Sequence, residues 1–183
     1  MLSYPILVVC GSPGAGKSTV ASALQVLLSH YLVRTVAWYR ADSVRRDLFG
    51  DAPYHYSQSD AVYKRLLELG AEVSEPGVVI LDGTFHSRRR AQAVTDKFAP
   101  RPVWFLYLKA SEAKRTSNLE RRGPDDPYGS LYTLEVHEVS TYVSPPFPLT
   151  CLCVNADLPL PQVIEDVWHH VMQIFRLDGC EKT

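Results

Sequence analysis

A glycine-rich stretch from Gly11 to Ser18 is the part of this chain whose residue types and spacing point most directly to chemistry. It reads Gly-Ser-Pro-Gly-Ala-Gly-Lys-Ser and matches the P-loop pattern G-x-x-x-x-G-K-[ST], with an apolar run before it and an amphipathic segment after it. Glycines allow backbone N–H groups to point inward at a phosphate, and the following helix adds its positive N-terminal end. The pattern predicts a nucleotide phosphate site, and the alternative is an ordinary glycine-rich turn.

Side chains of this stretch have separate expected tasks. We expect Lys17 to reach the β- and γ-phosphates, Ser18 to coordinate Mg²⁺ through its hydroxyl and Thr19 to contact the α-phosphate. These tasks predict nucleotide binding, but they do not specify a reaction. The nucleotide-binding residues predicted here are Gly11, Ser12, Pro13, Gly14, Ala15, Gly16, Lys17, Ser18 and Thr19.

Two aspartates follow apolar runs further along the chain. Asp42 comes at the carboxyl end of a predicted strand, where open α/β sheets bind ligands, and it can orient an acceptor hydroxyl and take its proton. Arg45, one helical turn later, can hold an anionic acceptor. Asp82 ends a second apolar run and is a candidate Mg²⁺ carboxylate, with Thr84 beside it on the acceptor side. The alternatives are that Asp42 caps the next helix and that Asp82 belongs to an Asp-Gly turn.

Three consecutive arginines, Arg88, Arg89 and Arg90, come shortly after the second aspartate. Guanidinium groups form strong paired hydrogen bonds to carboxylates and phosphates. These arginines can therefore grip an anionic group of an acceptor, and the alternative is the solvated start of a basic helix.

A later helical segment carries Arg115, Arg121 and Arg122 and ends at the Gly-Pro break of residues 123–128. We expect residues 115–130 to form a short lid whose arginines close over the phosphates and exclude water. The alternative is that Arg121 and Arg122 only complement the C-terminal end of their helix.

Short apolar runs alternate with longer segments of helical periodicity along most of the chain. This alternation is typical of a parallel sheet covered by helices on both faces and predicts the α/β class. The expected strands are Ile6 to Cys10, Thr35 to Tyr39, Val78 to Leu81, Val103 to Leu108 and Leu149 to Val154. Apolar positions at spacings of three and four predict amphipathic helices around Val20 to Tyr31, Val62 to Val73 and Val163 to Ile174.

The composition is that of an ordinary globular chain. With 183 residues, of which 46% are hydrophobic and 21% charged, we expect a single domain over residues 1–183. The net charge of -1 provides no general positive field for nucleic acid, although a local basic channel could accept a strand end.

No run is long enough for a membrane helix and no signal peptide is recognisable, so the expected location is the cytoplasm. The cysteines lack the spacing of a zinc site, and Cys151 and Cys153 are expected as buried small hydrophobes on one strand face.

These residues favour a kinase among the classes of P-loop protein. No Asn-Lys-x-Asp motif follows the loop, which disfavours a GTPase. The hypothesis is a Mg²⁺-ATP kinase that transfers the γ-phosphoryl group to a hydroxyl of an anionic small molecule or nucleotide, and the alternative of another class is a regulatory nucleotide-binding protein or an ATPase without an acceptor. Predicted catalytic residues are Lys17, Asp42, Arg45, Arg121 and Arg122; predicted acceptor residues are Asp42, Arg45, Asp82, Thr84, Arg88 and Arg89; predicted metal ligands are Ser18 and Asp82.

Several of these motifs together resemble small P-loop kinases. They are Gly11 to Thr19, Asp42-x-x-Arg45 with Leu48-Phe49-Gly50, Tyr63-x-x-Leu66-Leu67-Glu68-Leu69, Leu81-Asp82-Gly83-Thr84-Phe85 and Leu119-x-Arg121-Arg122. The chain is similar to the AAA_33-type ATP-binding kinases, the kinase domains of 5′-hydroxyl polynucleotide kinases and the adenylylsulfate kinases. The similarity extends over most of the chain.

The resemblance implies more than the motifs alone. It implies a three-layer fold whose five parallel strands lie in the order 2-3-1-4-5, with ATP and Mg²⁺ as cofactors and adenine near Arg115 and residues 155–159. It also implies that Asp42 is the acceptor-side carboxylate, that Arg45 supports the acceptor and that Arg121 or Arg122 is the lid arginine. The segment Thr84-Phe85-His86-Ser87 replaces the Phe-Ile-Ser-Pro segment of the adenylylsulfate kinases, which disfavours adenylylsulfate as the acceptor.

Overall fold

Five short runs of branched and aromatic residues form one parallel sheet. In the computed structural model, which describes residues 4–32, 35–52, 55–73, 77–122 and 151–177, the strands lie in the order β2-β3-β1-β4-β5. The predicted order and the α/β class are therefore confirmed. The strands are β1 (Ile6–Cys10), β2 (Val36–Arg40), β3 (Val78–Asp82), β4 (Val103–Lys109) and β5 (Cys151–Asn155).

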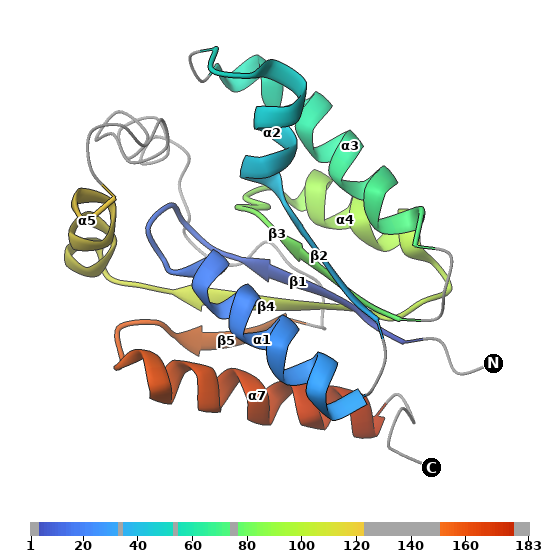
Figure 1. Cartoon of the computed structure of the whole chain (residues 1–183), viewed down its shortest axis with the longest axis vertical. Coiled ribbons are helices and arrows are strands. Elements are labelled where there is room, and N and C mark those ends of the chain that lie inside the picture. The colour runs from blue at the N-terminus through green and yellow to red at the C-terminus, as the bar shows by residue number, and fades with distance from the viewer. Residues whose placement is uncertain (1–3, 33–34, 53–54, 74–76, 123–150, 178–183) are drawn as a thin grey trace.

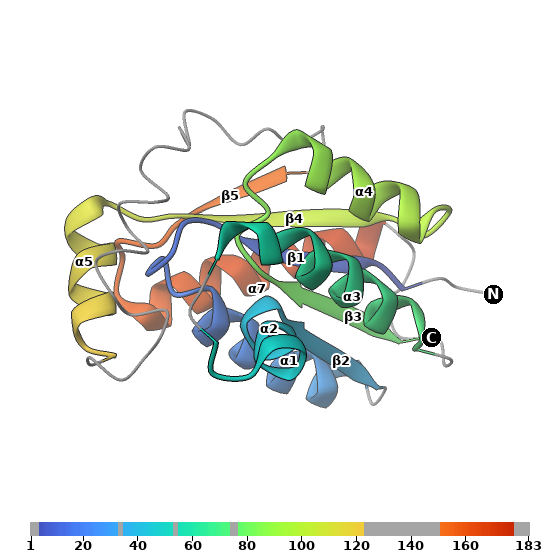
Figure 2. The same cartoon turned by 90° about the horizontal axis from the view of Figure 1, so that it is seen from above.

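Helices cover both faces of the sheet, so the molecule has three layers (Figure 1). The helices α1 (Lys17–Leu32) and α7 (Leu160–Leu177) pack on one face. The opposite face carries α2 (Ala41–Phe49), α3 (Ser59–Ala71) and α4 (Arg88–Phe98). A short 3-10 helix, η1 (Tyr56–Gln58), precedes α3, and α5 (Glu112–Glu120) lies beyond the carboxyl end of β4, at one end of the molecule (Figure 2).

The central strand explains why the layers hold together. Every residue of β1 is fully buried, and its side chains alternate between the two faces. Leu7 and Val9 belong to the core under α1 and α7, whereas Ile6, Val8 and Cys10 belong to the core under α3 and α4. A strand that is covered on both faces has to be apolar throughout, which is how the sequence reads at this point.

Strand register brings the predicted site residues to one edge of the sheet. Val9 of β1 is opposite Asp82 of β3, and Arg40 of β2 is also opposite Asp82. The Gly83 N–H donates a hydrogen bond to the Val9 carbonyl oxygen at 3.2 Å, which ties the end of β3 to the end of β1. Since parallel strands end at the same edge, the glycine-rich loop, Asp82 and the start of α2 meet there.

Some expectations about individual elements need correction. Cys153 is exposed and Cys151 is only partly buried, because this face of β5 lies at the margin of the core under α3 and α4, whereas Val154 on the other face is buried under α7. Val73 lies beyond α3, which ends at Ala71. The strand start predicted at Leu149 and the lid residues 123–130 lie outside the described residues. None of the helices in the described ranges is long and apolar enough to span a membrane.

Candidate active site

The glycine-rich loop connects β1 to α1, and its backbone packs closely against α5. Gly14 has a φ of 78°, a left-handed conformation that glycine adopts without steric cost. A Cβ at this position would lie 2.6 Å from the carbonyl oxygen of Arg115. The Asn118 side-chain amide donates a hydrogen bond of 2.8 Å to the Gly14 carbonyl oxygen. Glycine is therefore required here both by conformation and by the close approach of α5.

Lys17 is the first residue of α1, and its side chain folds back over the loop. Its Nζ donates a hydrogen bond of 2.9 Å to the Ser12 carbonyl oxygen. Burial lowers the pKa of Lys17, and the carboxylates of Asp82 and Asp42 oppose that shift by stabilising the charged amine. This position brings a positive charge between the loop and two carboxylates.

The Asp82 carboxylate is buried, and part of its hydrogen-bonding capacity is not used. Its side chain is 3% exposed, and its Oδ2 lacks a hydrogen-bond partner within the described ranges. The Ser18 hydroxyl donates a hydrogen bond to the carboxylate, and the Arg40 Nε lies 3.8 Å from Oδ2. Burial raises the pKa of Asp82, because it disfavours the charged form more than Lys17 and the other neighbours favour it.

A buried carboxylate oxygen without a hydrogen-bond partner needs an explanation, and a divalent cation supplies one. Mg²⁺ prefers oxygen ligands and commonly binds through one or two protein oxygens together with substrate phosphates and water. Asp82 and the Ser18 hydroxyl meet that requirement. The residues present therefore fit Mg²⁺, provided that a nucleotide and water supply the remaining ligands.

Asp42 is the second residue of α2 and not its cap. The N-cap residue is Arg40, and no side chain caps the helix. The helix-capping interpretation of Asp42 is therefore wrong. The carboxylate instead lines a cavity together with Lys17 and Asp82.

This acceptor cavity, as we call it, is enclosed by segments that are far apart in the sequence. Its walls come from the glycine-rich loop, α2, the η1–α3 segment, the loop after β3, α4 and the end of α5. The lining residues are Pro13, Gly14, Lys17, Ser18, Ala41, Asp42, Arg45, Gln58, Ser59, Val62, Tyr63, Asp82, Gly83, Thr84, His86, Arg90 and Arg122. The structure thus brings together most of the predicted catalytic and acceptor residues.

Arg45 is 3% exposed and forms part of the wall of the acceptor cavity. Its Nη1 donates to the Gly50 carbonyl oxygen at 3.4 Å, and its Nη2 donates to the Ala52 carbonyl oxygen. The guanidinium therefore ties the end of α2 to the segment that follows, in addition to facing the cavity.

The arginine run after β3 is arranged differently from the prediction. Arg90 is 7% exposed and lines the cavity, whereas Arg88 and Arg89 are exposed and do not line it. Ser87 caps α4 by accepting a hydrogen bond from the Arg90 N–H, which fixes where the helix begins. The helical period then turns position 90 inward with Val94 and Phe98, so the spacing of four residues was the available signal.

Tyr63 was missed by the sequence analysis as a residue of the site. Its hydroxyl lies 2.8 Å from the Thr84 Oγ1 and accepts a hydrogen bond of 3.1 Å from the Phe85 N–H. Phe85 has a positive φ of 44°, which is unusual for a residue with a side chain. Burial raises the pKa of Tyr63, so the phenol stays protonated. Tyr63 therefore holds the loop that carries Thr84 in place.

A second cavity lies on the other side of the glycine-rich loop. Thr19, Lys114, Asn118, Arg121, Ala156 and Leu158 are among its lining residues, with apolar side chains of α7 beside them. Arg115 itself does not line it, and its contribution is the backbone contact with Gly14. Arg121 is the C-cap residue of α5 and lines this cavity alone, whereas Arg122 lines both cavities. Arg122 therefore faces both sides of the glycine-rich loop, whereas Arg121 faces one.

Comparison with protein families gives a match over most of the chain. Residues 6–143 match the model of the AAA_33 family, described as an AAA domain. A shikimate kinase of Thermobifida fusca is 31% identical over 129 residues, which are 68% of this chain and 70% of that protein.

Two other similarities are more distant. A sulfate adenylyltransferase of Neurospora crassa is 22% identical over 117 residues, and the chain spans only 20% of the length of that protein. Among solved structures, a gluconokinase from Sinorhizobium meliloti 1021 superimposes with a TM-score of 0.68 at 16% identity, covering 94% of this chain and 93% of that one. At 16% identity, the similarity to the gluconokinase shows a shared fold alone.

Proposed function

Because this chain belongs to the AAA_33 family and its relatives include kinases, we propose that it is an ATP-dependent kinase that transfers the γ-phosphoryl group to a hydroxyl of a small molecule. One observation carries the proposal. The end of the phosphate loop, Lys17 and Ser18, lines the same cavity as the carboxylates of Asp42 and Asp82. A triphosphate held by the loop would place its last phosphorus next to an enclosed space with a general base.

The proposed reaction is an in-line transfer. An acceptor hydroxyl oxygen forms a bond to the γ-phosphorus while the bond from that phosphorus to the β,γ-bridging oxygen breaks, and ADP leaves. Asp42 accepts a hydrogen bond from the hydroxyl, orients its oxygen and takes its proton as the new bond forms. Mg²⁺, when bound at Ser18 and Asp82, would neutralise charge on the phosphates.

Cationic side chains complete the phosphate side of the proposed site. Lys17 would contact the β- and γ-phosphates, since its Nζ already lies over the loop at Ser12. Arg122 would stabilise charge on the transferred group from the opposite side, since it lines both cavities. The base of ATP would lie in the second cavity, beside Asn118 and Leu158.

The enclosure of the acceptor cavity favours a small acceptor. Its walls come from several elements, and Val62 and Tyr63 of α3 contribute to one side of it. The net charge of -1 provides no general positive field for a nucleic acid chain. A 5′-hydroxyl strand end is the second acceptor class that the test below includes.

The test is a screen of acceptor-stimulated ATP consumption in which product masses are measured. It includes sugar alcohols, sugar acids, nucleosides and a 5′-hydroxyl oligonucleotide. We expect at least one small hydroxyl compound to gain the mass of one phosphoryl group. We expect Asp42→Asn to reduce this transfer by about 10²-fold or more while ATP affinity is retained.

Asp47→Asn is the matched control for that variant. Asp47 lies on the same helix, is exposed and does not line the cavity, so the same chemical change should leave transfer intact. ATP binding without any acceptor-stimulated turnover would contradict the kinase proposal. Full transfer activity in Asp42→Asn would contradict the role of Asp42.

A further inference from the structure

Arg40 lies beside the proposed metal carboxylate but outside both cavities. Strand register places Arg40, the last residue of β2, opposite Asp82 at the end of β3. The Arg40 Nε lies 3.8 Å from the Asp82 Oδ2, so the two side chains form an ion pair that is too long for a hydrogen bond. Both atoms are buried, and neither has a hydrogen-bond partner in the part of the chain that the structure describes. A positive charge therefore faces the same oxygen that fits a divalent cation.

The position of the Arg40 guanidinium is supported by a neighbour on the same strand. Its central carbon lies 5.5 Å from the centroid of the Trp38 ring, a distance at which a cation is attracted to an aromatic face. Trp38 is two residues earlier in β2 and therefore lies on the same face of the sheet. The Arg40 side chain is 40% exposed although its Nε is buried, so water still hydrates its outer end. This arrangement keeps the charge next to Asp82 at little cost in hydration.

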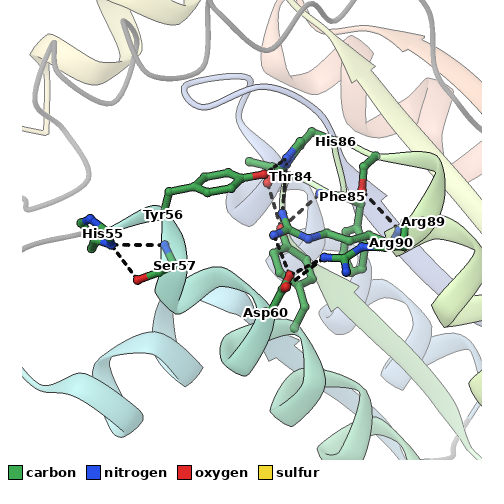
Figure 3. Close-up of polar contacts among 11 residues, drawn as sticks. His55, Tyr56, Ser57, Asp60, Thr84, Phe85, His86, Arg89 and Arg90 are labelled. Atoms are coloured by element: carbon green, nitrogen blue, oxygen red, sulfur yellow. Dashed lines mark hydrogen bonds and ion pairs between the residues drawn. The ribbon is translucent and has the colours of Figure 1, made fainter.

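Arg90, a buried arginine of the acceptor cavity, is arranged differently. Figure 3 shows its guanidinium among polar side chains of the cavity wall, with Nη1 3.1 Å from the His86 Nδ1 and Nη2 3.4 Å from the Asp60 Oδ1. It also stacks on Tyr63, 4.3 Å from the centroid of the ring. These contacts engage Arg90 with the wall itself. Arg40, in contrast, faces a carboxylate that the metal ion also requires.

Several groups act on the charge of Asp82. Burial raises the pKa of this carboxyl group and Asp42 raises it further, whereas Lys17 and, more weakly, Arg40 lower it. Both cations therefore stabilise the ionised form. Lys17 lines both the phosphate loop and the acceptor cavity and contacts the phosphates under the proposed function. Arg40 lines neither cavity, so we expect its charge to remain at Asp82 when a nucleotide is bound.

We infer that Arg40 is the resident counter-charge of Asp82: it stabilises the ionised carboxylate before Mg²⁺ binds, and it opposes the binding of the ion. The inference rests on the metal site of the proposed function and adds the control of its metal affinity. A divalent ion at Asp82 is repelled by a unit positive charge beside it. Mg²⁺ alone therefore binds weakly, and the phosphates of ATP bring the ion to the site. Because Arg40 acts through Asp82, it is a positioning residue and not a catalytic one.

The first test measures metal binding without nucleotide or acceptor. Mn²⁺ is the probe, because it prefers the same oxygen ligands as Mg²⁺ and electron paramagnetic resonance reports its free concentration. Arg40→Met removes the charge and keeps an apolar side chain beside Trp38. We expect Mn²⁺ to bind this variant about 10-fold more tightly than the wild type, the order expected when the repulsion between a unit charge and a divalent ion is removed in a hydrated environment. Equal affinity in the two proteins would overturn the inference.

Two further variants separate the local charge from packing and from net charge. Arg40→Lys keeps a positive charge at the end of β2, so its Mn²⁺ affinity should stay close to that of the wild type. Arg46→Met removes the same charge from an exposed position of α2 that lines neither cavity, and it should change Mn²⁺ affinity little. A gain in Arg46→Met as large as that in Arg40→Met would show an effect of net charge and would overturn the inference.

Thermal unfolding gives a second readout, which a purely structural arginine would not produce. Without metal and near neutral pH, Arg40→Met should melt at a lower temperature, because the ionised Asp82 loses a counter-charge. Saturating Mg²⁺ should narrow the difference, since the ion binds the folded protein and supplies positive charge at the same carboxylate. A difference that Mg²⁺ leaves unchanged would contradict the inference. Should Arg40→Met fail to fold, Arg40→Gln replaces it in both measurements.

The failure of this inference is distinguishable from the failure of the proposed function, because the metal titration contains no acceptor. If an acceptor is phosphorylated but Mn²⁺ binds Arg40→Met and the wild type equally, the kinase function stands and the role of Arg40 is wrong. If no acceptor of any class stimulates ATP consumption but Arg40→Met binds Mn²⁺ more tightly, the kinase function is wrong and the role of Arg40 stands.

Discussion

The two sides of the candidate active site are built in different ways. The phosphate side is a continuous stretch, Gly11 to Thr19, in which backbone groups and glycine conformations determine the shape. The acceptor side is assembled from side chains of α2, η1, α3, α4 and the loop after β3. A backbone site depends on local sequence, whereas a side-chain site depends on how helices pack on the sheet.

This difference separates what is general in the site from what is specific. Backbone N–H groups bind any phosphate in the same way. Side chains such as Asp42 and Arg90 can be exchanged without changing the loop. We therefore expect changes on the phosphate side to affect every acceptor and ATP binding together, and changes on the acceptor side to affect transfer alone.

The largest effect is expected from Lys17→Ala. It removes the positive charge that lies between the loop and the carboxylates of Asp82 and Asp42. We expect ATP affinity to fall and phosphoryl transfer to fall by about 10³-fold, for every acceptor alike. Calorimetric ATP titration and turnover measurements check this. Unchanged ATP affinity, or a loss of transfer activity that differs between acceptors, would contradict the expectation that the phosphate side serves every acceptor alike.

A smaller effect is expected from Gly14→Ala. Alanine in a left-handed conformation costs about 1–2 kcal/mol, and the new Cβ would also approach the Arg115 carbonyl oxygen to 2.6 Å. We expect ATP affinity to fall by about tenfold or more. Gly50→Ala is the control, because Gly50 also has a positive φ but has nothing within 4 Å of its Cβ position. Equal ATP affinity in the two variants would show that the contact with α5 does not matter for the loop.

The smallest effect is expected from Asp82→Asn, measured as thermal stability. Burial raises the pKa of Asp82 above its usual value. The ionised carboxylate therefore destabilises the fold at pH values above that raised pKa. Near neutral pH we expect the variant to melt about 2–4 °C higher for each kcal/mol relieved. The difference should shrink as the pH falls through the raised pKa, where the wild-type carboxyl group is protonated. A variant that melts lower than the wild type near neutral pH would contradict the cost assigned to the buried carboxylate.

The fold and the phosphate side could be predicted from the sequence because their signals are local. The run from Ile6 to Cys10 is apolar at every position, and it is the central strand, buried on both faces. The loop pattern is contiguous, so Gly11 to Gly16 lie between β1 and α1, and Lys17 and Ser18 begin α1 as expected. Asp42 and Asp82 follow their strands directly, and strand register then brings them to the same edge.

The acceptor side was less predictable because it depends on which positions of each helix turn toward the cavity. Arg88, Arg89 and Arg90 are chemically alike, and only the start of α4 at the Ser87 cap determines that the third one turns inward. Tyr63 lies on α3, 21 residues before Thr84 in the sequence, and no local pattern predicts that their hydroxyl groups lie 2.8 Å apart. Cys153 was expected to be buried, but only the opposite face of β5, at Val154, is covered by the core under α7.

The most direct test of this account is a crystal structure with a non-hydrolysable ATP analogue and Mg²⁺. We expect the γ-phosphorus to lie between Lys17 and Arg122 and to face the Asp42 carboxylate across the acceptor cavity, with the metal ion on Ser18 and Asp82. An analogue whose terminal phosphate points away from Asp42, or whose triphosphate leaves the glycine-rich loop, would contradict the account.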